Sequence, residues 1–200
     1  MIISQYEQRS PEWFNERLGC VTASNASKII TATGKPSTQA KAYMYQLLAE
    51  WEAGKPVDVF EPTAAMQNGI DREDDARNLY SFITGNQVDE VGLIYKDDSK
   101  LVGASVDGII GDSGVWECKC PKASTLIGYR LDDKMPSAYF PQVQMQMYVT
   151  DRKWADFFSY HPDIKHFYIR VERDDKYIET LSGLVCKFID EMLDKRETLK

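Results

Sequence analysis

The stretch from Leu101 to Pro121, LVGASVDGIIGDSGVWECKCP, constrains the fold more than any other part of this 200-residue sequence. Two β-prone apolar runs flank a cluster of turn-forming residues, Gly111-Asp112-Ser113-Gly114. The pattern predicts a β-hairpin. Its first strand runs from Leu101 to Val106 and continues through Ile109-Ile110, and its second strand runs from Val115 to Cys120. The chain must therefore build a sheet around this hairpin.

Three charged side chains lie within the hairpin: Asp107, Glu117 and Lys119. Because side chains alternate along a strand, Glu117 and Lys119 point one way while Cys118 and Cys120 point the other. The hairpin also brings Asp107 close to Glu117. Carboxylate oxygens suit Mg²⁺, and one or two such ions activate water for attack at phosphorus. A lysine beside them orients that water or offsets charge on the phosphate, and Cys118 would add only its backbone carbonyl.

The same residues also allow a plainer interpretation. Asp107-Gly108 is common turn chemistry, and Glu117 with Lys119 is typical of a solvated ion pair on a strand face. The apolar residues on both sides favour the site, because charged groups in such a setting are seldom left without partners.

Composition limits the class of protein. The length predicts one domain over residues 1–200, and 43% hydrophobic with 28% charged residues is ordinary for a globular chain. A net charge of −7 argues against a surface that binds nucleic acid all over, but leaves room for a local groove. No secretory signal and no apolar run of membrane-spanning length is evident. Four scattered cysteines favour a reduced, cytosolic protein.

The order of the expected elements predicts an α/β protein with a central mixed β-sheet flanked by helices. Expected helices cover residues 11–18, 22–30, 38–53, 63–84, 123–133, 137–150 and 175–196. Expected strands outside the hairpin cover residues 87–95, 153–160 and 166–172.

Two expected helices carry further candidates. Glu73 falls on the apolar stripe of the helix over residues 63–84, whereas the neighbouring aspartates point elsewhere. A carboxylate there needs a partner, which would be a metal ion, a lysine or an arginine in a partly buried salt bridge. Gln142 shares a helix face with Gln146 and would order a water or a ligating carboxylate, unless it is a surface glutamine.

A possible anion site lies near the N-terminus. Arg17 falls in the last turn of the first helix, where a cation stabilises the helix, and Thr22-Ala23-Ser24 opens the next helix with capping hydroxyls. Because a helix N-terminus also binds anions, Arg17 and Ser24 together would hold a terminal phosphate.

Asp107 followed by Glu117-Cys118-Lys119 resembles the PD-(D/E)xK nuclease signature, with Val106 in place of its proline. Five blocks in the same order resemble phage lambda exonuclease and its viral recombinase relatives. They are LGCVTAS at 18–24, EDDAR at 73–77, SVDG at 105–108, ECKCP at 117–121 and AYFPQVQ at 138–144. Together these blocks extend over most of the chain, so the resemblance is far more specific than any single motif.

The resemblance implies a restriction-endonuclease-like core and a set of site residues. Asp107 and Glu117 would bind metal, Glu73 would add a carboxylate, directly or through water, Lys119 would be catalytic, and Gln142 would support the site. Arg17, Ser24, Thr22 and Lys122 would contact DNA and its 5′-phosphate. The implied cofactor is Mg²⁺, as one or two ions, with Mn²⁺ as a substitute.

The resemblance also implies an activity and partners. The family digests one strand of double-stranded DNA from 5′ to 3′, releases mononucleotides and leaves a 3′ single-stranded overhang for recombination by strand annealing. Its members commonly form a homotrimeric ring and work with a phage single-strand annealing protein, here in the bacterial host cytoplasm and without a membrane.

One departure from the family pattern concerns the 5′-phosphate. Residues 122–125 read Lys-Ala-Ser-Thr, so no arginine follows the lysine motif, and Lys122 lacks the bidentate guanidinium fork. Two alternative functions stay open. One is a structure-specific or restriction-type endonuclease on the same fold, and the other is a non-catalytic DNA-binding module that retains it.

Overall fold

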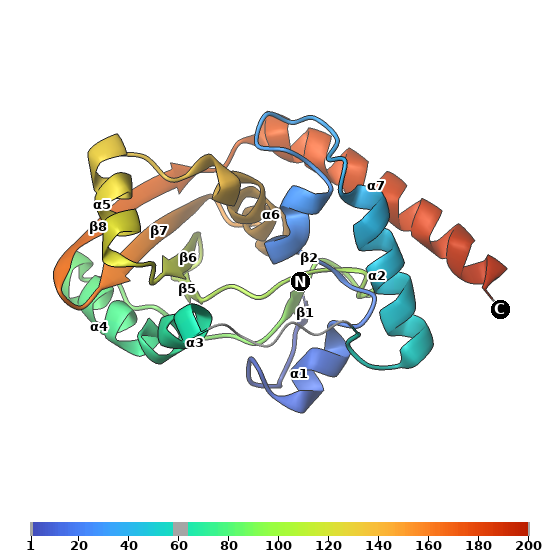
Figure 1. The fold of residues 1–200 in the computed structure, drawn as a ribbon, viewed down its shortest axis with the longest axis horizontal. Helices are drawn as coiled ribbons and strands as arrows, with labels where there is room; N and C mark the ends of the chain where they lie inside the picture. Colours follow the sequence, from blue (N-terminus) through green and yellow to red (C-terminus); the bar gives the residue numbers. More distant parts are fainter. Residues whose placement is uncertain (1, 58–63, 200) are drawn as a thin grey trace.

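The computed structural model describes residues 2–57 and 64–199 as a mixed α/β fold with two four-stranded sheets flanked by helices (Figure 1). The strands are β1 (Ile2–Ile3), β2 (Val21–Thr22), β3 (Ile94–Tyr95), β4 (Val102–Ala104), β5 (Gly108–Ile110), β6 (Gly114–Lys119), β7 (Trp154–His161) and β8 (Ile164–Glu172). The α-helices are α1 (Pro11–Glu16), α2 (Ala40–Ala53), α3 (Ala64–Asp71), α4 (Glu73–Thr84), α5 (Ala123–Asp132), α6 (Phe140–Thr150) and α7 (Asp175–Thr198). The 3₁₀ turns are η1 (Ala23–Lys28) and η2 (Ser137–Tyr139).

Both sheets are mixed. The first has the order β1-β3-β4-β2, with β2 and β4 parallel, and the second has the order β5-β6-β7-β8, with β6 and β7 parallel. Helix α6 contacts strands of both sheets and also η1 and α7, and it lies between the two halves of the molecule (Figure 1). The expected α/β class, with mixed sheets and flanking helices, is confirmed, but the strands divide into two sheets.

Helix α6 is buried on almost every side, which explains its mostly apolar sequence. Val143, Met145, Met147 and Val149 are at most 1% exposed and belong to the largest apolar cluster, together with residues of α2 and α7. Two glutamines on the same helix are also fully buried, and each must find polar partners inside the protein. The core therefore fixes α6 rigidly beside β6.

The prediction of one continuous strand from Leu101 to Ile110 is wrong. Residues 102–104 pair in the first sheet as β4, and residues 108–110 pair with β6 in the second sheet as β5. Gly108 allows this change of sheet, because a Cβ there would lie 2.2 Å from Val88 Cγ1. The true hairpin is β5–β6, with Ile109 opposite Val115, and Asp107 lies in the link that joins the two sheets.

Other boundaries also differ from the sequence prediction. The expected helix over residues 63–84 is broken at Arg72 into α3 and α4, and Thr63 lies outside the described residues. A new helix start at this point is favourable, because three acidic residues fill the first turn of α4 and complement its dipole. The helix expected over residues 22–30 is the 3₁₀ turn η1, and the strand over residues 87–95 is reduced to β3 and one isolated bridge from Asp89 to Ile109.

Within residues 2–57 and 64–199, no helix has both the length and the hydropathy that crossing a membrane requires.

Candidate active site

Asp107 and the end of strand β6 meet at the point where the two sheets join. The Asp107 Oδ2 atom accepts a hydrogen bond of 2.8 Å from the backbone amide of Cys118. On one face of the strand the Lys119 ammonium contacts Glu117 Oε1, and on the other face the sulfur atoms of Cys118 and Cys120 are 3.9 Å apart. The alternation expected from the sequence is therefore observed, and Asp107 lies beside it.

Glu117 is held by an unusually complete set of donors. Its side chain is only 1% exposed. Gln142 Nε2 donates to Oε1 over 2.6 Å, beside Lys119, and Gln146 Nε2 donates to Oε2. Gln142 thus contacts a carboxylate, as expected, and is not a surface residue. Gln146 was not predicted as a site residue, although it shares a helix face with Gln142 and that spacing was a usable signal.

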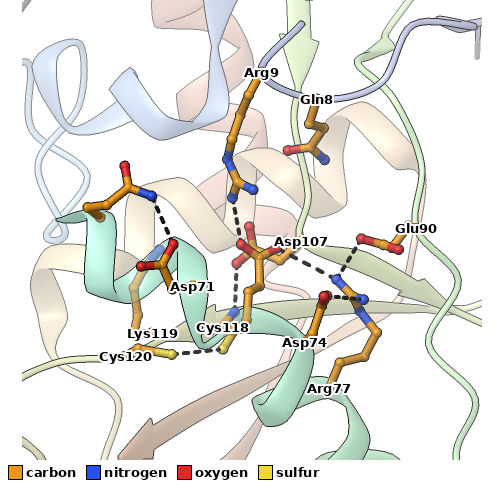
Figure 2. A network of polar contacts seen from close by, with 12 residues as sticks. Gln8, Arg9, Asp71, Asp74, Arg77, Glu90, Asp107, Cys118, Lys119 and Cys120 are labelled. Atoms are coloured by element: carbon orange, nitrogen blue, oxygen red, sulfur yellow. Dashed lines mark hydrogen bonds and ion pairs between the residues drawn. The ribbon is translucent and has the colours of Figure 1, made fainter. Parts of the chain in front are cut away.

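Glu73 opens helix α4 and is held by two arginines. Arg9 Nη2 lies 2.6 Å from Glu73 Oε2, and Arg77 Nη2 lies 3.8 Å from Oε1. The Glu73 side chain is 16% exposed, whereas that of Asp74 is 82% exposed, so Glu73 alone of these two turns inward. Of the partners expected for Glu73, the structure thus shows arginine, in a partly buried salt bridge. Figure 2 shows Arg9 reaching down from the N-terminal segment toward Asp107.

Two adjoining cavities open on these residues. One, of about 490 Å³, is lined by Arg9, Glu73, Asp107, Lys119 and Tyr139 among others. The second, of about 610 Å³, shares Arg9, Glu73 and Asp107 with the first. The Lys119 ammonium lies 5.3 Å from the centre of the Tyr139 ring. The space beside Asp107 and Lys119 is therefore open to a ligand.

The electrostatics of the site couple the carboxylates to the lysine. Burial raises the pKa of Asp107 well above its usual range, and the Glu117 and Glu73 carboxylates raise it further against the opposing effect of Lys119. Burial by itself would lower the pKa of Lys119, but the negative charges of Glu117 and Asp107 raise it overall. The crowded carboxylates therefore disfavour the charged form of Asp107 and favour the charged form of Lys119.

A divalent cation fits the chemistry of these donors. Hard oxygen ligands, chiefly carboxylates, are what Mg²⁺ prefers, and Asp107 and Glu73 both line the cavity with Cys118. Within residues 2–57 and 64–199 no group of three or more His, Cys, Asp or Glu side chains is gathered closely enough to hold a metal ion. The observed carboxylates are instead engaged by Arg9, Lys119 and the two glutamines, whose donors a cation would partly displace.

The residues expected to bind a 5′-phosphate form a separate pocket. Arg17 Nη1 donates to Ser105 Oγ over 2.8 Å, its guanidinium lies 4.2 Å from the centre of the Trp13 ring, and burial lowers its pKa. Arg17 and Thr22 line a cavity of about 410 Å³. Ser24 is exposed, with its hydroxyl 3.2 Å from that of Thr22.

Ser105 contacts Arg17, whereas Lys122 lies outside the Arg17 cavity. Ser105 was not singled out from the sequence, yet it joins Arg17 to the segment that carries Asp107 only two residues later. Lys122 is exposed at the N-cap of α5 and is not among the residues that line the Arg17 cavity. The structure therefore brings Arg17, Thr22 and Ser24 together and leaves Lys122 apart.

Comparisons with known proteins show similarity in sequence and in fold. Residues 12–153 match the family model of the YqaJ-like viral recombinase domain. The chain is similar to the crystal structure of an alkaline exonuclease, LHK-Exo, from Laribacter hongkongensis, with 36% identity, a TM-score of 0.86, and coverage of 95% of this chain and 96% of that one. The complex of LHK-Exo with dAMP gives 37% identity, a TM-score of 0.85 and coverage of 96% of both chains.

A viral protein shows a similarity to part of its length. An uncharacterised protein of Acanthamoeba polyphaga mimivirus is 28% identical over 172 residues, which cover 78% of this chain and 29% of that protein. The chain thus spans less than a third of this viral relative.

Proposed function

The chain belongs to the YqaJ-like viral recombinase family, and from that premise we propose that it is a divalent-metal-dependent exonuclease acting on the ends of double-stranded DNA. It digests one strand from 5′ to 3′, releases mononucleotides and leaves a 3′ single-stranded overhang for strand annealing. Mg²⁺ is the proposed cofactor, with Mn²⁺ as a substitute, and residues 1–200 form one exonuclease domain. The similarity to LHK-Exo, an alkaline exonuclease, supports the nuclease assignment.

One observation carries this proposal: Asp107, Glu117 and Lys119 converge where a cavity opens. Asp107 is bonded to the amide that follows Glu117, and Lys119 contacts the Glu117 carboxylate. Glu73, from a different helix, lines the same cavity as Asp107 and Lys119. Two carboxylates beside one ammonium, with a third from helix α4 lining the same cavity, support phosphodiester hydrolysis better than a solvated ion pair.

Each of these residues has a distinct proposed role. A bound divalent cation would supply Lewis-acid stabilisation of the phosphate oxygens and lower the pKa of water. Asp107, Glu117, Glu73 and the carbonyl of Cys118 are the groups that would hold it. The charges of Glu117 and Asp107 raise the pKa of Lys119, and its ammonium would donate hydrogen bonds to the attacking water or a phosphate oxygen. Gln142 and Gln146 fix the orientation of Glu117.

The Arg17 pocket supports recognition of a strand end. The Arg17 side chain is half-buried, its guanidinium contacts the Ser105 hydroxyl and the Trp13 ring, and the Glu50 carboxylate lines the same cavity. A half-buried guanidinium that lines a cavity is suited to an anionic ligand. We assign this pocket, with Thr22 and Ser24, to the terminal 5′-phosphate, while Lys122 remains a candidate contact to DNA.

Family membership also supports an assembly. We propose a homotrimeric ring around the DNA and a phage single-strand annealing protein as a partner, both acting in the cytoplasm of a bacterial host.

A single digestion experiment tests the function. Linear duplexes that differ only in a 5′-phosphate or 5′-hydroxyl are incubated with Mg²⁺ beside a closed circular duplex, using the wild type and Lys119→Ala. Linear DNA should yield mononucleotides, most rapidly from 5′-phosphate ends, and the circle should stay intact. Lys119→Ala should lose at least about 10²-fold in rate, because a preorganised donor is removed, with its circular dichroism spectrum unchanged.

The other outcomes separate the alternatives. Cleavage of the closed circle would identify an endonuclease on the same fold. DNA binding without turnover by the wild type would identify a non-catalytic module. Digestion by Lys119→Ala at the wild-type rate would refute the proposed role of Lys119.

A further inference from the structure

We propose that Arg9 is a phosphate-binding residue of the active site, which holds Glu73 in the free protein and moves to a backbone phosphate of DNA when a divalent cation occupies the carboxylates. The inference rests on the proposed function and adds a residue to it. It concerns an arginine that joins the N-terminal segment to Glu73, an acidic residue that lines both cavities.

The position of Arg9 places it at the entrance to the site. It lies in the loop between β1 and α1, directly before Ser10, the N-cap residue of α1. Its ion pair with Glu73 spans 64 residues of sequence. Arg9, Glu73 and Asp107 line both the cavity of about 490 Å³ and the adjoining one of about 610 Å³. A phosphate that entered either cavity would therefore meet Arg9.

The backbone holds Arg9 in a strained conformation at this place. Its φ angle is +71°, in the left-handed region that side-chain-bearing residues seldom adopt. The preceding residue is anchored, because Gln8 Nε2 donates to the carbonyls of Val91 and Val106 over 3.0 and 2.7 Å. Val106 directly precedes Asp107 in the sequence. The Arg9 backbone is thus fixed against the segment that carries the site, and such strain is commonly kept where it serves function.

The Arg9 side chain, in contrast, is the replaceable partner of Glu73. It is 44% exposed, and its recorded contact within the described residues is the single ion pair to Glu73. Arg77 is 14% exposed and is engaged by Asp74 at 2.9 Å and by Glu90 at 2.7 Å as well. Because partly exposed ion pairs contribute little to stability, Arg9 can leave Glu73 at small cost, whereas Arg77 cannot.

A cation and Arg9 would compete for the same oxygen. Divalent cations bind carboxylate oxygens at roughly 2.0–2.6 Å, and Arg9 Nη2 already lies 2.6 Å from Glu73 Oε2. Two positive charges so close to one oxygen repel each other. A DNA phosphate drawn to the cation would offer the guanidinium a better acceptor, because its planar fork matches phosphate oxygens. Exchange of Glu73 for phosphate therefore couples cation binding to DNA binding.

The first test measures the affinity for Mg²⁺ alone, by calorimetry without DNA. Arg9→Met and Arg9→Gly should bind Mg²⁺ more tightly than the wild type, by about fivefold, because a competing cation is removed. Arg9→Gly also relieves the left-handed backbone, so agreement between the two variants excludes misfolding as the cause. If Arg9 instead fixed Glu73 for the cation, both variants would bind Mg²⁺ more weakly, and the inference would be overturned.

The second test measures binding of duplex ends in Ca²⁺, chosen to permit binding without turnover. Arg9→Met should bind about tenfold more weakly and lower the slope of log K against log salt by about 1, because one phosphate contact is lost. Arg9→Lys should keep the slope and lose part of the affinity, since lysine lacks the fork. The matched control is Arg130→Met, which removes an exposed arginine from the last turn of α5 and should leave both values unchanged.

These outcomes distinguish this inference from the proposed function. A wild-type protein that neither binds Mg²⁺ nor digests linear DNA would refute the function itself. A wild type that digests DNA, with an Arg9→Met variant of unchanged salt slope, would refute the role of Arg9 alone.

Discussion

Two aspartates, one on a strand of the second sheet and one in the link between the two sheets, have opposite surroundings. Asp156, on β7, is 0% exposed, and its carboxylate accepts four hydrogen bonds. Arg170 Nε donates to Oδ1 over 2.8 Å, and Oδ2 accepts from Arg170 Nη2, the Tyr80 hydroxyl and the Tyr168 hydroxyl at 2.9, 2.5 and 3.1 Å. Every donor that a buried carboxylate requires is present, and a full positive charge balances it.

Asp107 has only a fraction of that support. Its recorded donor among the described residues is the Cys118 amide, and it lies beside two further carboxylates that raise its pKa. It also lines both cavities. The protein therefore supplies hydrogen-bond donors and a balancing positive charge to the Asp156 carboxylate. The Asp107 carboxylate requires a bound ligand to supply them. A buried charge that is left uncompensated next to a cavity marks a reactive site, and a compensated one marks the framework.

We expect the largest effect from a substitution that removes the Asp156 carboxylate. Asp156→Ala should lower the free energy of unfolding by roughly 3 kcal/mol, because it leaves the buried Tyr80 hydroxyl and Arg170 without their acceptor. Urea denaturation measures this change. The digestion rate per folded molecule should stay near that of the wild type, because Asp156 does not line either of the active-site cavities.

A surface pair supplies the control for this prediction. Arg173 and Asp175 form a bond of 2.7 Å, but the Asp175 side chain is 83% exposed. Asp175→Ala should therefore cost no more than about 1 kcal/mol. A large loss of activity in folded Asp156→Ala would show that the two centres are not independent.

Two buried glutamines on helix α6 have different hydrogen-bond partners, and we expect their substitutions to have different effects. Gln146 donates to the Glu117 carboxylate, while Gln144 donates to the Glu172 carbonyl and accepts from the Asp174 amide. Gln146→Leu should reduce the digestion rate by about 10–100-fold, because a residue that orients a ligating carboxylate is lost. Its stability should also fall, because the buried Glu117 Oε2 loses a donor, although removal of Gln146 Oε1, which has no hydrogen-bond partner within the described residues, offsets part of this cost.

Gln144→Leu is the matched variant, with the same change two residues away. It should lower stability, because the Glu172 carbonyl and the Asp174 amide lose their part-buried hydrogen bonds to the glutamine, and leave the rate of the folded protein unchanged. If both variants lowered the rate equally, Gln146 would act only through the packing of α6.

Local pattern predicted one part of the site well. The period of two along a strand placed Glu117 and Lys119 on one face, and the helical stripe turned Glu73 inward. The helix face of Gln142 allowed either a surface glutamine or one that orders a carboxylate, the family resemblance implied the second, and Gln142 contacts Glu117. These features depend on neighbours within a few residues, so the sequence carries them directly.

Other features depend on contacts that span much of the chain. Arg9 meets Glu73 across 64 residues, and Tyr80 meets Asp156 across 76, so no local pattern announces either pair. The break between β4 and β5 arises because the chain changes sheets at Asp107, which an apolar run cannot reveal. Sequence could therefore indicate the residue types of the site, but only the packed fold shows which carboxylate is compensated.

The smallest expected effect concerns the stability of the metal-free protein. Asp107→Asn should raise the free energy of unfolding by about 1 kcal/mol at neutral pH, because it removes a poorly compensated charge and keeps an acceptor for the Cys118 amide. The pKa of Asp107 is raised in the folded state above the unfolded value of about 3.9. Protonated Asp107 therefore contributes its full share of the free energy of unfolding at a pH below the unfolded pKa. That contribution is lost as the pH rises through the folded pKa.

The advantage of Asp107→Asn should consequently be small at pH 4 and larger at pH 8, measured by urea denaturation in a chelator. Mg²⁺ should then stabilise the wild type by neutralising the same charge, and it should stabilise the variant less, because ligand binding to the folded state raises stability in proportion to affinity. If the variant were less stable than the wild type at pH 8 without metal, the Asp107 carboxylate would be compensated by the protein, as that of Asp156 is. Asp107 would then need no ligand to balance its charge, and the physical reason for locating the cation at Asp107 would be lost.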